Sequence, residues 1–253
     1  MPKRLTRTPS EIHAMRESGQ MLAAILQMLK EQTVPNISTK ELAEIAAKEL
    51  RSLGGAPTFL GYYGFPDIIC ISINNEVVHG IPRADKIISE GDIVSLDFGV
   101  TYRGMITDAA ISYVLGKAKK KHQQLVSITE KSLYAGLAVL HDGIRTGDLG
   151  FAIETVLNKH HYGVVRDLVG HGVGQKLHED PSIPNYGRPG SGVSLYNNMT
   201  IAVEPMATLG TYKVFTANDG WTVLTQDGSW AAHFEHSVLI TEKGCEILTA
   251  LSA

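Results

Sequence analysis

Two acidic residues lie inside a segment whose apolar pattern predicts a strand, a turn and a second strand. The segments "IVSLDFGV" and "MITDAAISYV" contain Asp97 and Asp108, eleven positions apart. If the turn is centred on Tyr102 and Arg103, an antiparallel hairpin places the two carboxylates directly opposite each other, with Cβ atoms about 5 Å apart. Opposed like charges in an apolar strand are unfavourable unless a cation neutralises them. Arg103 or a lysine could pair with one of them, but a residue at the turn is expected to point to solvent, so the pair favours a metal.

Two glutamates occupy similar positions later in the chain. Glu204 lies in "MTIAVEPMA" and Glu235 in "HFEHSVLIT", although glutamate is uncommon in the interior of a strand. The Asp227-Gly228 pair predicts a hairpin turn that joins "TVLT" to the strand of Glu235. Either glutamate alone would more often be a surface residue. Four such carboxylates with one imidazole suit two divalent cations, because the four negative charges balance the ions.

Three histidines in loop-like segments are candidates for the same site. His79 lies in "VVHGIP" and His171 in "VGHGVG", where glycine lets the backbone and a ligand approach closely, and His178 follows in "KLHEDP". His233 and His236 flank Glu235; His233 shares its face in a regular strand and is the weaker candidate. The remaining histidines are expected on helices or at helix ends, solvated or structural: His13, His122, His141, His160 and His161.

Composition narrows the class of protein. The 253 residues are 43% hydrophobic and 19% charged, with a net charge of −3, so nothing favours nucleic acid or an anionic membrane as a partner. No apolar run reaches about 18 residues, and no signal-peptide core follows the basic start of the chain. The two cysteines, Cys70 and Cys245, form no CxxC motif, which favours a reducing, cytoplasmic compartment.

The order of predicted elements repeats along the chain. Thr8 and Ser38 each begin a capping motif, and a helix is expected after each of them. The segments "ISTKELAEIAAKEL" (37–50) and "IRTGDLGFAIETVL" (144–157) align at a constant offset of 107 residues. Chance similarity of two amphipathic helices is the alternative to a duplication. We interpret the chain as one α+β domain over residues 1–253, with similar halves at about 9–115 and 119–241.

The expected elements follow this order in both halves. Helices are predicted at 9–31, from 39 to the Gly54-Gly55 pair, at 119–141 and at 146–163. Strands are predicted at 68–73, 93–100, 105–115, 164–168, 200–207, 221–225 and 233–241.

Taken together, these residues resemble the type I methionine aminopeptidases, a metallopeptidase family with the pita-bread fold. The matching stretches are "GAPTFLGYYGFP", "NNEVVHGIP", "GDIVSLDFG", "ITDAAISY", "GHGVGQKLHEDPSIPNYG", "MTIAVEPM" and "FEHSVLIT". The resemblance implies a single catalytic domain in which two pseudo-symmetric halves share a central, mostly antiparallel sheet covered by helices.

The resemblance also implies roles for individual residues. Two divalent ions (Co, Mn, Fe or Zn) would be held by Asp97, Asp108, His171, Glu204 and Glu235. Glu204 would move a proton, His178 would stabilise the developing oxyanion, and His79 would contact the scissile amide nitrogen. A slot for the substrate side chain would be lined by Phe59, Tyr62, Phe65, Cys70 and Trp221, together with His79 and His178. The chain departs from the bacterial pattern at Phe59 and Leu177, which bears on the shape of this slot.

The activity implied is removal of the N-terminal methionine from nascent proteins and peptides whose second residue is small. The partners are then the N-terminal segments of newly made proteins, with no nucleic-acid or membrane site, in a cytoplasmic monomer; a contact with the ribosome is left open. A prolidase or aminopeptidase P-like enzyme of the same fold is one alternative, although such enzymes usually carry an extra N-terminal domain and only a short lead precedes Thr8. A non-catalytic binding homologue is the other alternative, although such relatives lose ligands.

Overall fold

The computed structural model describes residues 6–251. Within them, four α-helices are α1 (Pro9–Gln32), α2 (Thr39–Ser52), α3 (Lys120–Leu137) and α4 (Thr146–Lys159), and Tyr62–Gly64 form a short 3-10 helix, η1. Local signals explain where the first two helices begin. The Thr8 side chain accepts a hydrogen bond from the Glu11 amide, and Ser38 does the same for Glu41, so both capping boxes are formed. All four predicted helices are confirmed, with ends that differ by a few residues.

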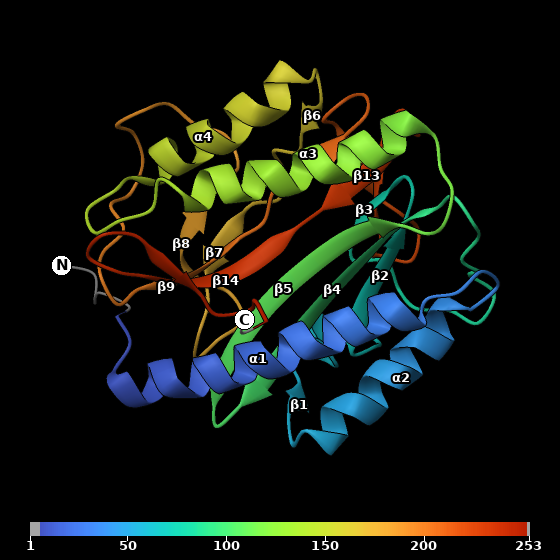
Figure 1. Cartoon of the computed structure of the whole chain (residues 1–253), viewed down its shortest axis with the longest axis horizontal. Coiled ribbons are helices and arrows are strands. Elements are labelled where there is room, and N and C mark those ends of the chain that lie inside the picture. Colours follow the sequence, from blue (N-terminus) through green and yellow to red (C-terminus); the bar gives the residue numbers. More distant parts are fainter. Residues whose placement is uncertain (1–5, 252–253) are drawn as a thin grey trace.

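A nine-stranded antiparallel sheet forms the centre of the molecule (Figure 1). Its strand order is β1-β4-β5-β14-β9-β7-β8, with β2 also paired to β4 and β15 to β14. The strands are β1 (Ala56–Pro57), β2 (Ile69–Ile73), β4 (Ile93–Tyr102), β5 (Met105–Val114), β7 (Gly170–Gly172), β8 (Glu179–Ile183), β9 (Thr200–Val203), β14 (Glu235–Ile240) and β15 (Cys245–Ile247). The prediction of a mostly antiparallel α+β fold is therefore confirmed.

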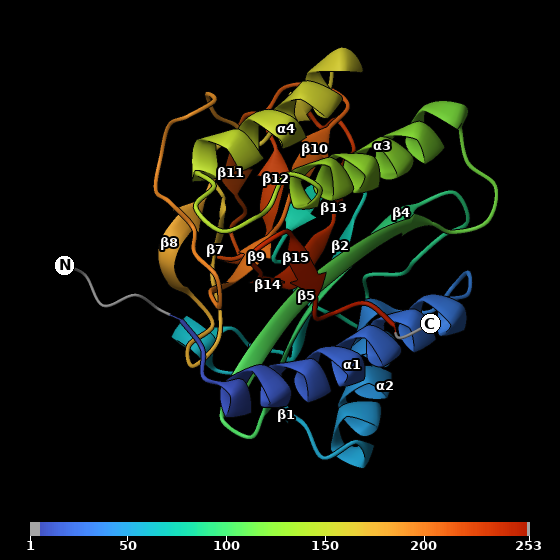
Figure 2. The ribbon, with the colours of Figure 1, turned by 60° about the vertical axis from the view of Figure 1, so that its left-hand side comes forward.

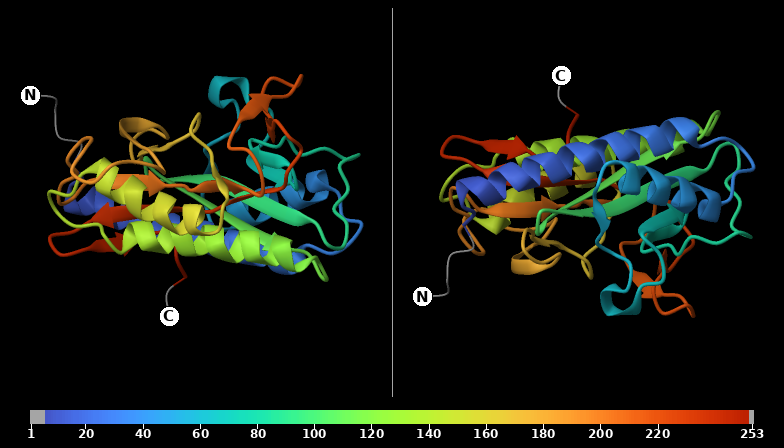
Figure 3. Two further views of the ribbon diagram at one scale, coloured as in Figure 1. Left: turned by 90° about the horizontal axis from the view of Figure 1, so that it is seen from above. Right: turned by 90° about the horizontal axis from the view of Figure 1, so that it is seen from below.

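The helices lie along one face of this sheet, as the two views of Figure 3 show. Helices α1 and α3 pack on the strands, α2 packs on α1, and α4 packs on α3. One buried apolar cluster joins α1 and α2 to β2 and β4, and another joins α3 and α4 to strands of the second half. The helices thus leave the opposite face of the sheet free for loops. No helix in the described part of the chain is long and apolar enough to cross a bilayer.

Two three-stranded sheets complete the fold, and the first of them packs against α3 and α4. One has the order β13-β10-β6 and the other β11-β12-β3. Their strands are β3 (Glu76–Val78), β6 (Gly163–Val164), β10 (Met206–Thr208), β11 (Val214–Thr216), β12 (Val223–Thr225) and β13 (Ala231–His233).

The predicted hairpin across Asp227-Gly228 is wrong. Strand β12 pairs with β11 and β3, whereas β13 pairs with β10. The Asp227 carboxylate accepts hydrogen bonds from the backbone amides of Thr211 (2.8 Å) and Ser229 (3.0 Å). It therefore ties this turn to the segment before β11, and the chain leaves the turn toward a different sheet.

Two of the long strands predicted in the second half are interrupted. The segment 200–207 divides at Glu204-Pro205 into β9 and β10, and the segment 233–241 divides at Phe234 into β13 and β14. Proline has no amide hydrogen for the ladder of a central strand, which explains the first break. Of the segment predicted at 164–168, only Val164 lies in a strand, the two-residue β6, and the strand predicted at 221–225 begins at Val223.

Candidate active site

The hairpin of β4 and β5 brings the two aspartates together, but in a different register from the predicted one. Tyr102 pairs with Met105, so Asp97 faces Ala110 and Asp108 faces Gly99. The turn lies at Arg103-Gly104, where both residues have positive φ (49° and 76°), as in the favoured two-residue hairpin turns. The predicted register, in which the two carboxylates are directly opposite each other, is therefore wrong by two positions. A shift of two keeps both side chains on one face of the sheet, so the aspartates are diagonal neighbours.

Arg103 does not neutralise these aspartates. Its side chain is 58% exposed and forms an ion pair with Glu17 at 2.7 Å. The expectation that it points to solvent is confirmed.

Neighbouring strands place the other three predicted donors beside the aspartates. Glu235 in β14 pairs with Ala110, His171 lies in β7, and Glu204 follows directly after β9. Ligand atoms of Asp108, His171 and Glu235 all lie within 4.8 Å of one another. Nε2 of His171 lies 3.6 Å from Oε1 of Glu204. The strand order, rather than closeness in sequence, thus gathers the five side chains.

The carboxylates of this cluster are buried, and several of their oxygens lack a protein partner. Oδ1 of Asp97, Oδ1 of Asp108 and Oε1 of Glu235 accept no hydrogen bond from any described residue. Burial raises the pKa of Asp97 to about 7. Burial, with the neighbouring carboxylates, raises the pKa of Asp108, Glu204 and Glu235 well above their ordinary values. Oxygens in this state fit a divalent cation, which would replace the missing partners and favour the charged forms.

The fifth predicted donor presents a free nitrogen. Nδ1 of His171 lies 2.9 Å from the carbonyl oxygen of Gly172. A carbonyl only accepts, so Nδ1 carries the proton and Nε2 has the lone pair that a metal ligand requires. Burial lowers the pKa of His171 to about 4, so the imidazole is neutral at pH 7. The orientation and the charge state therefore both fit the chemistry of a ligand.

This cluster lines a cavity of about 220 Å³, whose wall also includes five phenylalanine, tyrosine and tryptophan side chains. The ring centroids of Phe65 and Trp221 are 5.2 Å apart in an edge-to-face arrangement. Phe59 lies on the backbone of Gly99, where a Cβ atom would come within 2.7 Å of the ring, so glycine permits the close approach. Every predicted donor, catalytic residue and slot residue lines this cavity, together with Leu177 and Tyr63: Phe59, Tyr62, Phe65, Cys70, His79, Asp97, Asp108, His171, His178, Glu204, Trp221 and Glu235.

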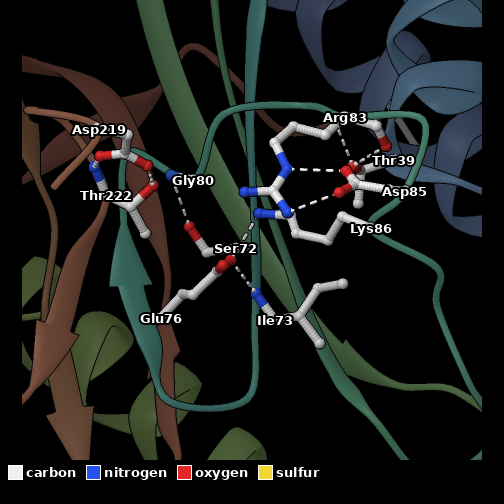
Figure 4. Close-up of polar contacts among 10 residues, drawn as sticks. All are labelled: Thr39, Ser72, Ile73, Glu76, Gly80, Arg83, Asp85, Lys86, Asp219 and Thr222. Atoms are coloured by element: carbon white, nitrogen blue, oxygen red, sulfur yellow. Dashed lines mark hydrogen bonds and ion pairs between the residues drawn. The ribbon is translucent and has the colours of Figure 1, made fainter. Parts of the chain in front are cut away.

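His79 lines the cavity from the loop that follows β3, and Figure 4 shows the contacts of the neighbouring residues Ser72, Glu76 and Gly80. Its backbone has a positive φ of 58°, and the amide of the next residue, Gly80, donates to Ser72 Oγ at 3.1 Å. Glu76 in the same hairpin accepts from the Ile73 amide (2.9 Å) and from Lys86 Nζ (2.7 Å). Burial lowers the pKa of His79 to about 4, so its imidazole is neutral at pH 7.

Trp221 is held by a turn that contains Asp219, close to His79. The Asp219 carboxylate accepts from the backbone amides of Trp221 (2.9 Å) and Thr222 (2.8 Å), and from the Thr222 hydroxyl (2.6 Å). Figure 4 shows Thr222 beside Asp219. The Trp221 ring then meets the His79 ring at a centroid distance of 6.4 Å. These bonds fix one side of the apolar cavity next to a neutral histidine.

His178 lies between the apolar cavity and the carboxylate cluster. Its Nδ1 atom is 2.9 Å from the Tyr62 hydroxyl, and its ring centroid is 4.3 Å from that of His171. If the hydroxyl donates this bond, Nε2 carries the proton. His178 can then donate a hydrogen bond to a group placed beside the cluster.

His233, which we treated as the weaker candidate, also belongs to this site. Its side chain is buried, and Nε2 lies 3.8 Å from Oε2 of Glu204. Neither ring nitrogen has a hydrogen-bond partner in the part of the chain that the structure describes, and burial lowers its pKa to about 3. The shared face with Glu235 was the sequence feature that could have identified it. His236 turns away and contacts Thr249 Oγ1 at 2.9 Å.

Known proteins are similar to this chain over nearly its whole length. The methionine aminopeptidase of Clostridium acetobutylicum is 42% identical over 245 residues, which is 97% of this chain and 98% of that protein. Methionine aminopeptidase 1 of Bacillus subtilis is 44% identical over the same shares. The crystal structure of methionine aminopeptidase from Thermotoga maritima superposes with a TM-score of 0.96 at 43% identity, covering 98% of this chain and all of that one.

More distant structures share the fold alone. The prolidase of Pyrococcus furiosus superposes with a TM-score of 0.79 at 21% identity, and the match covers 99% of this chain but 66% of that one. The fold is therefore the α+β pita-bread fold of these enzymes. The model of metallopeptidase family M24 matches residues 13–242 of the sequence. Those residues include every donor and wall residue of the cavity, and the chain belongs to metallopeptidase family M24.

Proposed function

We propose that this chain is a methionine aminopeptidase, which removes the N-terminal methionine from proteins and peptides whose second residue is small. One observation carries the proposal: the carboxylate cluster and its imidazole line the same cavity of about 220 Å³ as a set of apolar and aromatic side chains. A cavity of this kind accepts a single unbranched side chain next to the groups that would act on the following peptide bond. The names of the relatives support the same activity.

The proposed cofactor is a pair of divalent ions, Co, Mn, Fe or Zn, held by the five donors Asp97, Asp108, His171, Glu204 and Glu235. Such ions, when bound, polarise a carbonyl and lower the pKa of water. The oxygens and the imidazole nitrogen suit any of these metals, so supply in the cell decides among them.

The chain's own groups would then handle protons and charge. Glu204, whose pKa burial raises, is the proposed proton carrier that delivers a proton to the leaving nitrogen. His178, with Nδ1 engaged by Tyr62, would donate from Nε2 to the oxygen on which negative charge develops. His79 is neutral and would hydrogen-bond the nitrogen of the scissile amide.

The apolar cavity is the proposed site for the methionine side chain. The rings of Phe59, Phe65 and Trp221 give it edges and faces with which a thioether sulfur makes favourable contacts. Cys70 and Leu177 close it with short apolar surfaces, since burial raises the pKa of the Cys70 thiol and keeps it neutral. Phe59 and Leu177 therefore help to set the depth of the slot.

The proposed substrates indicate where the enzyme acts and with which partners. Newly made chains carry the N-terminal methionine, so we propose that the enzyme acts in the cytoplasm on their N-terminal segments. We propose that it acts as a monomer, because all five donors and all walls of the cavity come from one chain. No part of the proposed reaction calls for nucleic acid or a membrane; the ribosome is a candidate partner through its nascent chains.

A peptide comparison tests the activity against the nearest alternative, a prolidase-like or aminopeptidase P-like enzyme. The metal-loaded protein is expected to release methionine from Met-Ala-Ser and to leave Ala-Pro-Ser intact. The reverse preference would assign the second activity. Metal content tests the other alternative, a non-catalytic homologue. For such a protein we expect no bound metal and no release from either peptide.

A further inference from the structure

The segment before α1 is joined to the loop that carries His178 by a buried ion pair. Nη2 of Arg7 contacts Oε2 of Glu179, and the two side chains are only 4% and 5% exposed. Figure 2 shows this segment running beside the connection between β7 and β8, at the edge of the large sheet. The pair of Arg16 with Glu246 also links distant parts of the chain, but its side chains are 48% and 37% exposed.

Arg7 also donates hydrogen bonds to residues at the two ends of β7 and β9 nearest this loop. Nε donates to Thr200 Oγ1 at 2.8 Å, and Nη2 donates to the carbonyl oxygen of Val173 at 3.0 Å. The guanidinium lies against Gly174, where a Cβ atom would come within 2.4 Å of Arg7 Cζ. The planar group thus fits a site shaped for it, which the compact, rotatable ammonium of lysine would not reproduce.

Glu179 also forms a hydrogen bond with the backbone of the loop at residues 173–178. Its Oε1 atom accepts a hydrogen bond from the backbone amide of Lys176 at 2.9 Å, and the carbonyl oxygen of Lys176 accepts one from the Gly174 amide at 3.1 Å. A further link joins the Gln175 side chain to Glu11 in the first turn of α1, at 2.7 Å. Residues 173–178 are therefore fixed at several points by the start of the chain.

We propose that Arg7 is a positioning residue that acts through Glu179 to set the place of His178. The inference rests on the proposed function, in which His178 donates a hydrogen bond beside the carboxylate cluster. His178 is the neighbour of Glu179 in sequence, and Leu177, which closes the apolar cavity, precedes it. Loss of Arg7 leaves the buried Glu179 carboxylate without its cation, which is strongly unfavourable, so we expect the carboxylate to move and the loop to move with it.

Kinetics of Arg7→Met test the proposal, with Arg16→Met as the matched control. We expect kcat on Met-Ala-Ser to fall by about 10-fold to 100-fold, as for residues that orient a catalytic group, with KM changed less than about threefold. Arg7→Lys keeps the charge and should recover part of the loss. Glu179→Gln should reproduce the defect, and Arg16→Met should leave kcat unchanged. Unchanged kcat in both Arg7→Met and Glu179→Gln would overturn the proposal.

The combination with His178→Ala separates positioning from a general structural effect. If Arg7 acts through His178, Arg7→Met should reduce kcat by less than about twofold in the His178→Ala background, because residues that act as a unit are not additive. A full additional loss in the double variant would mean that Arg7 acts elsewhere.

Hydrogen exchange of the metal-free protein gives a readout that needs no activity. Amides of residues 173–178 should exchange faster in Arg7→Met and Glu179→Gln than in the parent or in Arg16→Met. Unchanged protection of this loop would overturn the proposal even if kcat fell. If the parent protein released no methionine, the proposed function would fail, whereas the exchange comparison would still decide whether Arg7 holds the loop. If Arg7→Met did not fold, Arg7→Lys and Glu179→Gln would carry both measurements.

Discussion

Oε2 of Glu204 lies 3.8 Å from Nε2 of His233, a histidine that is 1% exposed and has no hydrogen-bond partner among residues 6–251. The other oxygen of the same carboxylate faces His171 at 3.6 Å. Each oxygen of Glu204 therefore has its own imidazole. A group in this position can adjust the basicity of a proposed metal ligand without binding the metal itself.

We expect His233→Ala to lower kcat/KM by about 10-fold to 100-fold, the usual effect of removing a group that supports a metal ligand. His141→Ala is the control, because His141 is exposed and its Nδ1 atom lies 2.8 Å from the carbonyl oxygen of the neighbouring Asp142, far in sequence from the donors. Peptide hydrolysis and metal content are measured on both variants. Parent-like kinetics for His233→Ala would remove this residue from the site.

Removal of a proposed metal ligand is the most direct test of the cluster. Asp97→Ala and Glu235→Ala should fold, because each loses a buried carboxylate that the protein itself leaves unpaired. Both should lose bound metal and nearly all activity. Asp85→Asn, an exposed change in the Arg83 ion pair, is the matched control. Two bound metals and full activity in either alanine variant would contradict the assignment.

His178 is expected to act on charge rather than on metal binding. His178→Ala should keep its metal while kcat falls by about 100-fold to 1,000-fold, as when a donor to a developing oxyanion is removed. Tyr62→Phe removes only the 2.9 Å bond to Nδ1 and should cost about 10-fold, the worth of one such bond. A drop in metal stoichiometry for His178→Ala would instead identify it as a ligand.

Substrate preference follows from the shape of the cavity. Methionine should be preferred over leucine at the first position, by about 1–3 kcal/mol for a change of methylene size, and norleucine should remain a substrate. Alanine, glycine, serine or proline should be accepted at the second position, and leucine, lysine or phenylalanine rejected. Acetylation of the α-amine should abolish turnover. Equal release from Met-Ala-Ser and Met-Lys-Ser, or cleavage of the acetylated peptide, would show that the assignment is wrong.

The stability of the metal-free protein should depend on pH because of Asp97. Burial raises the pKa of this carboxyl from 3.8 to about 7, so between these values the folded chain binds more protons than the unfolded chain. The free energy of unfolding then decreases as pH rises through this window, and this group adds no further loss above it. Thermal unfolding after chelation should show Tm falling toward about pH 7. Asp97→Asn should make this fall shallower, although the raised pKa values of Asp108, Glu204 and Glu235 still contribute to it in the same direction. An equally steep fall in that variant would show that Asp97 does not contribute.

Local features of the sequence predicted the helices and the identity of the candidate residues. Capping boxes at Thr8 and Ser38 depend on residues three positions apart, so they can be identified without knowledge of the fold. Acidic residues in apolar strands are visible for the same reason. The positions of these acidic residues relative to one another could not be read from the sequence, because they depend on which strands become neighbours. Glu235, for example, lies beside Ala110, 125 positions away.

The errors have specific physical origins. Gly104 as the second turn residue was the local feature that could have corrected the hairpin register. The break at Pro205 could likewise be expected, since proline interrupts a ladder. The direction that the chain takes after Asp227 could not be expected from local sequence, because it depends on a hydrogen bond from the Thr211 amide. The constant offset between residues 37–50 and 144–157 reappears as two helices of 14 residues, α2 and α4, while duplication itself stays an interpretation.

The order of the five proposed donors along the chain determines when the site can form during translation. Asp97 and Asp108 lie on one hairpin, but their neighbour in the sheet is β14, which carries Glu235 near the far end of the sequence. When the β4–β5 hairpin has been made, a growing chain therefore holds two of the five donors, and β5 still lacks its second partner strand. The proposed enzyme would acquire activity only when β14 has left the ribosome and paired, so metal uptake would report completion of the fold. Two fragments divided between β5 and α3 should each be inactive and should regain metal binding only when they associate.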